Sequence, residues 1–487
     1  MKILHNINQL LNSQNLLGRS VRAGGILTLG SLAENLLRFI RNVILARLLV
    51  PEAFGLMAMV LATVAVMEAF TQVGLRQSVI HHKKGSEEGF LNVVWWLSSF
   101  RGLILYVIGF LIAPVICDFY QKPEMLPLIR AGFLAILFSG LMSPKVHALE
   151  KEMRFKGWVF LMQGSGASGV IVTMVAAFFI QNVWALVLGY MAESFLRSAL
   201  SFIFYPVIPH LTFEKLFLND ILRFSKKMFG LPILMMLFIQ TDVFVIGKVL
   251  SMGQLGMYAL AKSLAAMPST FLSRIVEPIV LPTLAQMQDD KAKLREGLLT
   301  LTRWATLLGL PFISFLVVFA EPILSIVYGS EYSVAAVPFG LLSVYSLFFL
   351  CSSFIMNMYI AIGQPDIHRI ASFTRTTLFL IIIYPATKYF GLAGAASSVL
   401  VSMFVLLAVQ IVYIRRLLHI GYLEYFGTWI EGIKLSLIVI LPGYLLNIFI
   451  KPQRVLTFVV GIILCITAWS LGIAKMVHLH KKDLAPR

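Results

Sequence analysis

The sequence predicts an all-α, polytopic membrane protein with about 14 transmembrane helices. Hydrophobic residues make up 59% of the 487 residues and charged residues only 13%, whereas a soluble domain carries roughly a quarter charged residues. The apolar residues form runs of about 20, which is the length that a helix needs to cross the bilayer core. In addition, a segment of the first half of the chain recurs in the second half.

Each apolar run is a candidate membrane-spanning helix. The runs cover residues 24–46, 53–75, 90–116, 126–144, 158–180, 183–207, 228–250, 256–284, 298–320, 335–362, 370–390, 392–414, 429–450 and 455–476. Very short turns separate the runs that meet near residues 180–183 and 390–392, so a count between 12 and 14 stays open at this point (about 20 residues per span).

The loops between the runs predict the orientation. Basic residues gather in alternate connections, for example Lys83 with Lys84 and Lys226 with Lys227. The intervening connections hold only isolated ones such as Lys122. Since cytoplasmic loops carry an excess of Lys and Arg, both termini are expected in the cytoplasm. The formal charge of +17 therefore reflects topology and contact with anionic lipid, and no nucleic-acid partner is expected.

An internal repeat suggests how the helices are grouped. The stretch VILARLLVPEAFGLMAM from Val43 aligns with FVIGKVLSMGQLGMYAL from Phe244, and this alignment places Arg47 opposite Lys248. Two six-helix lobes around a central cavity, plus two C-terminal helices, fit such a duplication. The expected parts are a cytoplasmic amphipathic lead-in (1–23), an N-terminal lobe (24–207), a cytoplasmic linker (208–227), a C-terminal lobe (228–416), two extra transmembrane helices (417–476) and a cytoplasmic tail (477–487).

Several spans contain ionisable residues, which are costly in a membrane unless they are paired or face water. Residues three or four apart lie on one helix face and can neutralise each other. This spacing relates Glu34 to Arg38, Glu193 to Arg197, Arg274 to Glu277, and Glu431 to Lys434. Structural pairing is one explanation of these charges, and a site that faces water is the other.

Other cations have no opposite charge within one helical turn: Arg41, Arg101, Lys262, Arg303 and Arg375. Arg41 and Arg303 lie near span ends, where their side chains can reach the headgroups. The excess of positive charge predicts an aqueous cavity that receives an anion, and arginine suits a phosphate or diphosphate. The candidate cavity residues are Arg38, Arg41, Arg101, Lys262, Arg274 and Arg303.

Two acidic residues are candidates for coupling transport to an ion. Glu68 and Asp242 lie within or at the end of a span, where a carboxylate is costly without a function or a partner. A structural role through hydrogen bonds is the alternative, above all for Asp242. Coupling to H⁺ or Na⁺ is left open, and no other cofactor is expected.

Enzymatic motifs are absent from the sequence. It contains no GxxxxGK[ST] phosphate loop and no HExxH metal motif, so no catalytic or metal-binding residues are predicted. His81 and His82 precede two lysines and fit a solvated basic loop better than a metal site. The glycine-rich run GSGASG at 164–169 lies inside an apolar span, which favours close helix packing over a phosphate loop.

The stretches ARLLVPEAFGLMAMVLAT and TQVGLRQSVIHHK, together with TDVFVIGKVLSMGQLGMYALA, resemble the polysaccharide-transporter family of the MOP flippase superfamily. In the last stretch the pattern is carried by Asp242, Gly247, Leu250, Gly256 and Tyr258. The branch that looks most similar contains the colanic acid, succinoglycan and teichuronic acid exporters.

The resemblance implies a flippase or exporter of the bacterial inner membrane that works by alternating access. Its substrate would be an undecaprenyl-diphosphate-linked oligosaccharide repeat unit, for exopolysaccharide or lipopolysaccharide biosynthesis. Its partners would be this polyprenyl-linked oligosaccharide, membrane lipid, and the polysaccharide polymerase and export machinery.

Three other functions are alternatives to this one. A cation-coupled multidrug or metabolite exporter of the same superfamily would be expected to carry unpaired acidic residues, whereas basic ones predominate here. A lipid II flippase shares the expected fold and charge. A membrane glycosyltransferase or polymerase needs a large external loop, and no external loop here exceeds about 15 residues when each span takes about 20.

Overall fold

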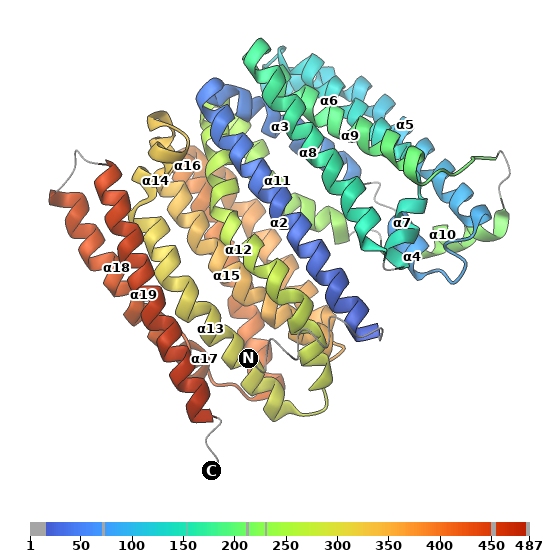
Figure 1. Cartoon of the computed structure of the whole chain (residues 1–487). Helices are drawn as coiled ribbons and strands as arrows, with labels where there is room; N and C mark the ends of the chain where they lie inside the picture. The colour runs from blue at the N-terminus through green and yellow to red at the C-terminus, as the bar shows by residue number, and fades with distance from the viewer. Residues whose placement is uncertain are drawn as a thin grey trace. The chain divides into compact units, whose positions relative to one another are not determined.

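The computed structural model describes residues 16–70, 74–152, 154–210, 214–228, 231–449 and 454–483. These residues form helices and connecting turns, and no strand occurs among them, which confirms the predicted all-α class. The chain folds into two compact units, residues 1–248 and 249–487. Figure 1 shows the long helices of each unit. The division falls one helix later than the expected start of the C-terminal lobe at 228, and the bounds of the predicted parts stay a prediction.

The first unit is a bundle of long helices with short helices at its ends. It contains α2 (Leu16–Leu48), α3 (Pro51–Phe70), α4 (Leu75–His81), α5 (Glu88–Tyr120), α6 (Met125–Gly140), α7 (Lys145–Lys151), α8 (Phe155–Ile180), α9 (Trp184–Phe204), α10 (Lys215–Met228) and α11 (Leu231–Val249). Helix α8 packs between α9 and α2, and α6 packs against α3, α5 and α9.

The second unit is built around α13 and α15. It contains α12 (Met252–Gln286), α13 (Lys291–Val318), α14 (Ala320–Val327), the 3₁₀ helix η1 (Ser330–Ala335), α15 (Ala336–Ala361), α16 (Pro365–Leu418), α17 (Tyr422–Gly427), α18 (Ile430–Phe449) and α19 (Arg454–Asp483). Helix α15 packs against α12, α13 and α16. The two helices at the C-terminal end, α18 and α19, pack against α13 and each other.

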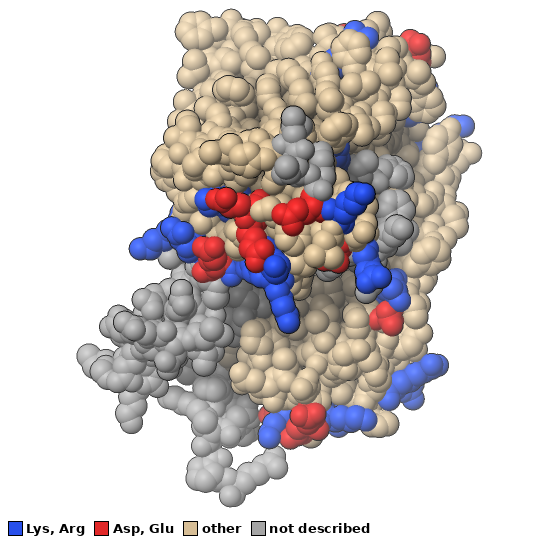
Figure 2. All heavy atoms as spheres, turned by 90° about the vertical axis from the view of Figure 1, so that its right-hand side faces the viewer, with Lys and Arg blue, Asp and Glu red and all other residues tan. Residues whose placement is uncertain are grey.

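Many of the helices are suited to a bilayer. In the described part of the chain, eight are long and apolar enough to cross a membrane, or nine if α6 and α7, bent by 63°, are one span. Apolar side chains stay exposed on them, such as Leu111 (68%) and Phe179 (84%). On the face in Figure 2, charged side chains gather beside a wide area with few of them. The chain is therefore a multi-pass membrane protein, and the count of 14 spans stays a prediction.

Helix α16 contains two of the predicted spans. Its 54 residues would measure about 80 Å as one straight helix, far more than the hydrocarbon thickness of about 30 Å. Gly391 interrupts it with φ 58° and ψ −140°, a conformation that glycine adopts because it lacks a Cβ. The break lies where the sequence predicts the turn between spans 370–390 and 392–414, and it confirms that turn.

The internal repeat is visible in the helix boundaries. Helix α2 ends at Leu48 and α3 begins at Pro51, while α11 ends at Val249 and α12 begins at Met252. These pairs of residues stand opposite each other in the sequence alignment of the repeat. The two copies begin their second helix with different residues. In the first copy α3 starts with Pro51, and proline suits the first helical turn because it lacks an N–H that would need a partner. In the second copy Ser251 caps α12 by accepting the N–H of Gln254 at 3.1 Å.

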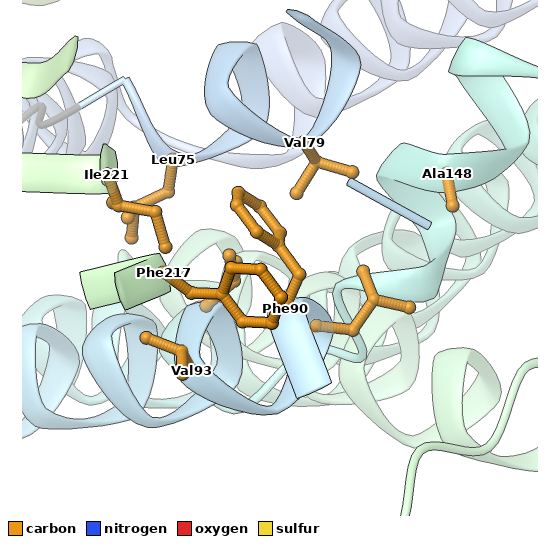
Figure 3. Packing of buried hydrophobic residues seen from close by; sticks show 9 residues of the cluster. Leu75, Val79, Phe90, Val93, Ala148, Phe217 and Ile221 are labelled. Carbon is orange, nitrogen blue, oxygen red and sulfur yellow. The ribbon is translucent and has the colours of Figure 1, made fainter. Parts of the chain in front are cut away.

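The predicted linker at 208–227 contains helix α10, which packs against α4 and α5 of the first unit. Figure 3 shows the apolar cluster that fixes it, in which Phe217 and Ile221 of α10 meet Phe90 of α5 and Leu75 of α4. This segment is thus a docked amphipathic helix. At the start of the chain, α2 begins at Leu16, and residues 1–15 of the predicted lead-in lie outside the described residues.

Candidate functional site

Seven of the charged side chains that the sequence places inside spans of the first unit interact as one group. We call it the arginine cluster: Glu34, Arg38 and Arg41 on α2, Glu68 on α3, Arg101 on α5, and Glu193 and Arg197 on α9. It contains one more guanidinium than carboxylate. The cluster therefore keeps a net positive charge when all its members are ionised.

Glu193 lies at the centre of this cluster. The Nη2 atom of Arg38 donates to both carboxylate oxygens of Glu193, at 2.8 and 2.9 Å, and Arg197 donates to Oε1 of the same carboxylate. Nε of Arg38 also donates to Glu34 at 3.0 Å. On α8, Ser165 accepts a hydrogen bond from Nε of Arg197 at 3.3 Å. The carboxylate of Glu193 thus joins α2 to α9, and Arg197 extends the network to α8.

The same-face pairs that the sequence predicts are confirmed. Arg38 pairs with Glu34 and Arg197 with Glu193, and Lys434 lies 3.3 Å from Glu431 in the second unit. The link between Arg38 and Glu193 was not predicted, because 155 residues separate them. The fourth predicted pair is Arg274 with Glu277, and the side chain of Glu277 lies outside the described part of the structure.

Glycines of α8 make room for the cluster. A Cβ at Gly166 would lie 3.0 Å from Oε1 of Glu34 and 3.3 Å from Nη2 of Arg38. A Cβ at Gly169 would lie 2.7 Å from Cβ of Glu193 and 3.0 Å from the carbonyl oxygen of Gly189. The run at 164–169 therefore serves close packing of α8 and α9, as predicted. It also clears space for charged side chains, which the sequence did not indicate.

Arg101 and Glu68 extend the cluster toward a pocket. Nη2 of Arg101 lies 3.5 Å from the carbonyl oxygen of Glu68, and the Glu68 carboxylate interacts electrostatically with Arg101 and Arg197. Both residues line a pocket of about 160 Å³, together with Arg76 and His147 among others. Arg41 donates to its neighbour Asn42 at 3.0 and 3.2 Å. Three of the six predicted cavity residues and one coupling candidate thus meet in the first unit.

The other candidates lie elsewhere. Lys262 is half-buried on α12, while Arg274 on α12 and Arg303 on α13 are exposed. Asp242 is buried on α11 and accepts the N–H of Val243 at 2.8 Å, which fits the structural alternative for this residue. The substrate and coupling roles of these residues stay predictions.

Outside the spans, the charged groups stabilise local structure. Arg76 of α4 donates from Nε to Glu150 of α7 at 2.9 Å, and this hydrogen bond raises the pKa of Arg76. Asp290 caps α13 by accepting the N–H groups of Ala292 and Lys293. These bonds, that of Lys293 first, lower the pKa of Asp290.

The histidine pair near α4 belongs to a packed region. The His82 ring stacks on Phe90 with 4.6 Å between ring centroids, and its Nδ1 accepts the N–H of Lys84 at 3.2 Å. Its Nε2 lies 3.5 Å from Asp220 of α10. Among the residues that the structure describes, no group of three or more His, Cys, Asp or Glu is arranged to hold a metal ion.

Comparisons with known proteins agree with this architecture. The profile of the family described as "Polysaccharide biosynthesis protein" matches residues 44–337. The lipopolysaccharide biosynthesis protein WzxC of Escherichia coli (strain K12) is 26% identical over 420 residues, which cover 86% of this chain and 85% of that protein. The succinoglycan biosynthesis transport protein ExoT of Rhizobium meliloti (strain 1021) is 25% identical over 320 residues, 66% of this chain and 65% of that protein.

A solved structure shows the same fold. The lipid II flippase MurJ, in an inward closed conformation, superimposes with a TM-score of 0.74. The match covers 94% of this chain and 99% of MurJ, at 15% sequence identity. At that identity the likeness is informative about the fold alone.

Proposed function

Because the chain belongs to the polysaccharide biosynthesis protein family, we propose that it is a flippase for an undecaprenyl-diphosphate-linked oligosaccharide repeat unit. It moves this unit from the cytoplasmic to the outer leaflet of the bacterial inner membrane for surface polysaccharide synthesis. The names of WzxC and ExoT, which refer to lipopolysaccharide biosynthesis and to succinoglycan transport, support the substrate class. The observation that carries the proposal is the arginine cluster inside helices of membrane-spanning length.

The chemistry of the substrate explains why such a cluster is needed. The lipid tail stays in the bilayer, but the diphosphate must pass through an apolar layer in which an isolated charge is costly. Guanidinium groups neutralise phosphate oxygens and bond two of them at once. In this proposal the diphosphate is bound by Arg38, Arg41 and Arg101 of the first unit and by Lys262, Arg274 and Arg303 of the second.

The transport is proposed to proceed by alternating access and without covalent chemistry. A gradient of H⁺ or Na⁺ would supply direction, with Glu68 and Asp242 as the coupling candidates. Both termini face the cytoplasm in this arrangement. The polysaccharide polymerase and the export machinery would receive the flipped unit on the outer side.

Deleting the gene tests this function. We expect loss of the surface polysaccharide, with the lipid-linked repeat unit accumulating on the cytoplasmic face and disappearing again when the gene is restored. Extraction of lipid-linked oligosaccharide and quantification of surface polymer measure both effects. A deletion strain with normal polysaccharide and raised sensitivity to cationic dyes would instead identify a drug exporter.

The lipid II flippase is the second candidate, because the fold that this chain shares with MurJ is compatible with both functions. The two functions differ in what the cell loses. Without its lipid II flippase a cell stops building peptidoglycan, whereas loss of a surface-polysaccharide flippase leaves the wall intact. A viable deletion strain with normal peptidoglycan incorporation would exclude the lipid II function.

A further inference from the structure

We propose that Glu193 is a built-in counter-ion of the anion site formed by Arg38 and Arg197, and that the diphosphate of the substrate displaces it. This inference rests on the proposed function. Glu193 then occupies the site in the substrate-free protein and returns to it when the substrate leaves. It is a positioning residue, because it acts through the two arginines.

The geometry shows one anionic position shared by two guanidinium groups. Arg38 reaches both oxygens of Glu193 at 2.8 and 2.9 Å, and Arg197 donates to Oε1 of the same carboxylate. The two donors come from different helices, α2 and α9. A phosphate oxygen in place of Oε1 would therefore accept charge-assisted hydrogen bonds from both arginines, which is the strong arrangement for phosphate recognition.

Exposure indicates which partner an incoming anion meets first. The side chains of Arg38 and Arg197 keep 31% and 24% of their surface exposed, while that of Glu193 keeps only 12%. The two guanidinium groups are thus more accessible than the carboxylate that they share. A diphosphate can thus contact the arginines before the carboxylate leaves them.

Glycine on α8 lets this helix approach the stem of Glu193 closely. Cβ of Glu193 lies against Gly169 of α8, where an added methyl group would come within 2.7 Å. A larger residue at position 169 would collide with the stem of Glu193, so glycine there is required for the observed position of this side chain.

Exchange of the carboxylate for the diphosphate avoids leaving charged groups without a partner inside the membrane protein. Two guanidinium groups without a counter-ion are costly within a membrane protein, and so is a diphosphate without partners. Exchange of one anion for another keeps the site close to neutral throughout transport. It also provides for release, because the returning carboxylate competes with the diphosphate for the same donors.

Binding of inorganic pyrophosphate to the purified full-length protein tests the inference. Glu193→Gln removes the competitor, and we expect it to bind pyrophosphate about tenfold more tightly than the wild type, about the value of one charge-assisted bond. Glu34→Gln is the matched control: it removes the same charge from a residue that also precedes an arginine by four positions. Among the described residues, Glu34 forms an ion pair with Arg38 and with no second arginine. The gain in pyrophosphate affinity of Glu34→Gln should be clearly smaller than that of Glu193→Gln. Isothermal titration calorimetry measures all three affinities.

Transport provides a second readout that a purely structural role would not produce. Glu193→Gln should slow transport of the lipid-linked repeat although it binds pyrophosphate more tightly, because release is impaired. Glu193→Asp keeps the carboxylate and should restore transport in part. Adding Arg197→Gln to Glu193→Gln should abolish the gain in affinity.

Equal pyrophosphate affinity of Glu193→Gln and the wild type, or equal gains in both glutamine variants, would overturn the counter-ion role and leave the flippase function untouched. A deletion strain without accumulated lipid-linked repeat would overturn the function and leave the pyrophosphate result standing. If Glu193→Gln does not fold, the pyrophosphate affinity of the single variant Arg197→Gln tests the inference instead. Unchanged pyrophosphate affinity in that variant contradicts a site built from both arginines.

Discussion

Charged side chains inside the helices are the residues on which the proposed function depends. Spacing along one helix was enough to predict the contacts of Glu34 with Arg38 and of Glu193 with Arg197, since residues four apart lie on the same face. It was not enough to show that Arg38 reaches Glu193. Which helix faces which depends on packing, and spacing along a single helix contains no information about it.

Charge reversal tests the cavity residues one at a time. We expect Arg101→Glu or Lys262→Glu to reduce export about tenfold or more, because each replaces a proposed phosphate donor by a repelling charge and loses a charge-assisted bond. Complementation of a deletion strain, with surface polysaccharide quantified, measures the effect.

Lys83→Glu is the control for this experiment, since it makes the same charge change at an exposed residue between α4 and α5. It should leave export close to the wild-type level. Normal export by both Arg101→Glu and Lys262→Glu would mean that the cavity does not bind its substrate through these cations.

The helices were predicted from the lengths of the apolar runs. This method located the turn between two helices correctly where two apolar runs are separated by only a few residues. The turn between α8 and α9 at residues 181–183 and the break at Gly391 both fall where the sequence placed them. Helix α10 was expected only as part of a linker. Its apolar face is short, so the sequence did not show that it packs on the helical bundle. The packing is seen only in the structure, where Phe217 and Ile221 contact α4 and α5.

The break in α16 leads to a prediction about one glycine. Gly391→Ala forces a Cβ into a backbone conformation with positive φ and should lower the free energy of unfolding by about 1–3 kcal/mol. Gly427→Ala is the control, because no atom lies within 4 Å of a Cβ there and its φ is not in the positive range. Thermal unfolding of both purified variants measures the difference. Equal melting temperatures for the two would show that Gly391 is not under this constraint.

The topology of the whole chain follows from its loops. We expect Glu124→Cys, in the connection between α5 and α6, to react with a membrane-impermeant maleimide added outside spheroplasts. Lys83→Cys, between α4 and α5, should react only after permeabilisation, because cytoplasmic loops carry the basic residues. The native Cys117, Cys351 and Cys465 are buried, so background labelling should be low. If Lys83→Cys reacted in intact spheroplasts and Glu124→Cys only after permeabilisation, the orientation would be the opposite of the predicted one.

The sequence by itself determined the all-α class, the multi-pass character, the helix turns and the duplicated α2–α3 and α11–α12 segments. All of these follow from composition, run length and local spacing, which are properties of neighbouring residues. Only the tertiary structure decided that α10 is docked on the first unit and that Glu193 lies between Arg38 and Arg197. These features depend on which helix faces pack together, and that is set by the shapes of surfaces formed by residues far apart in the chain.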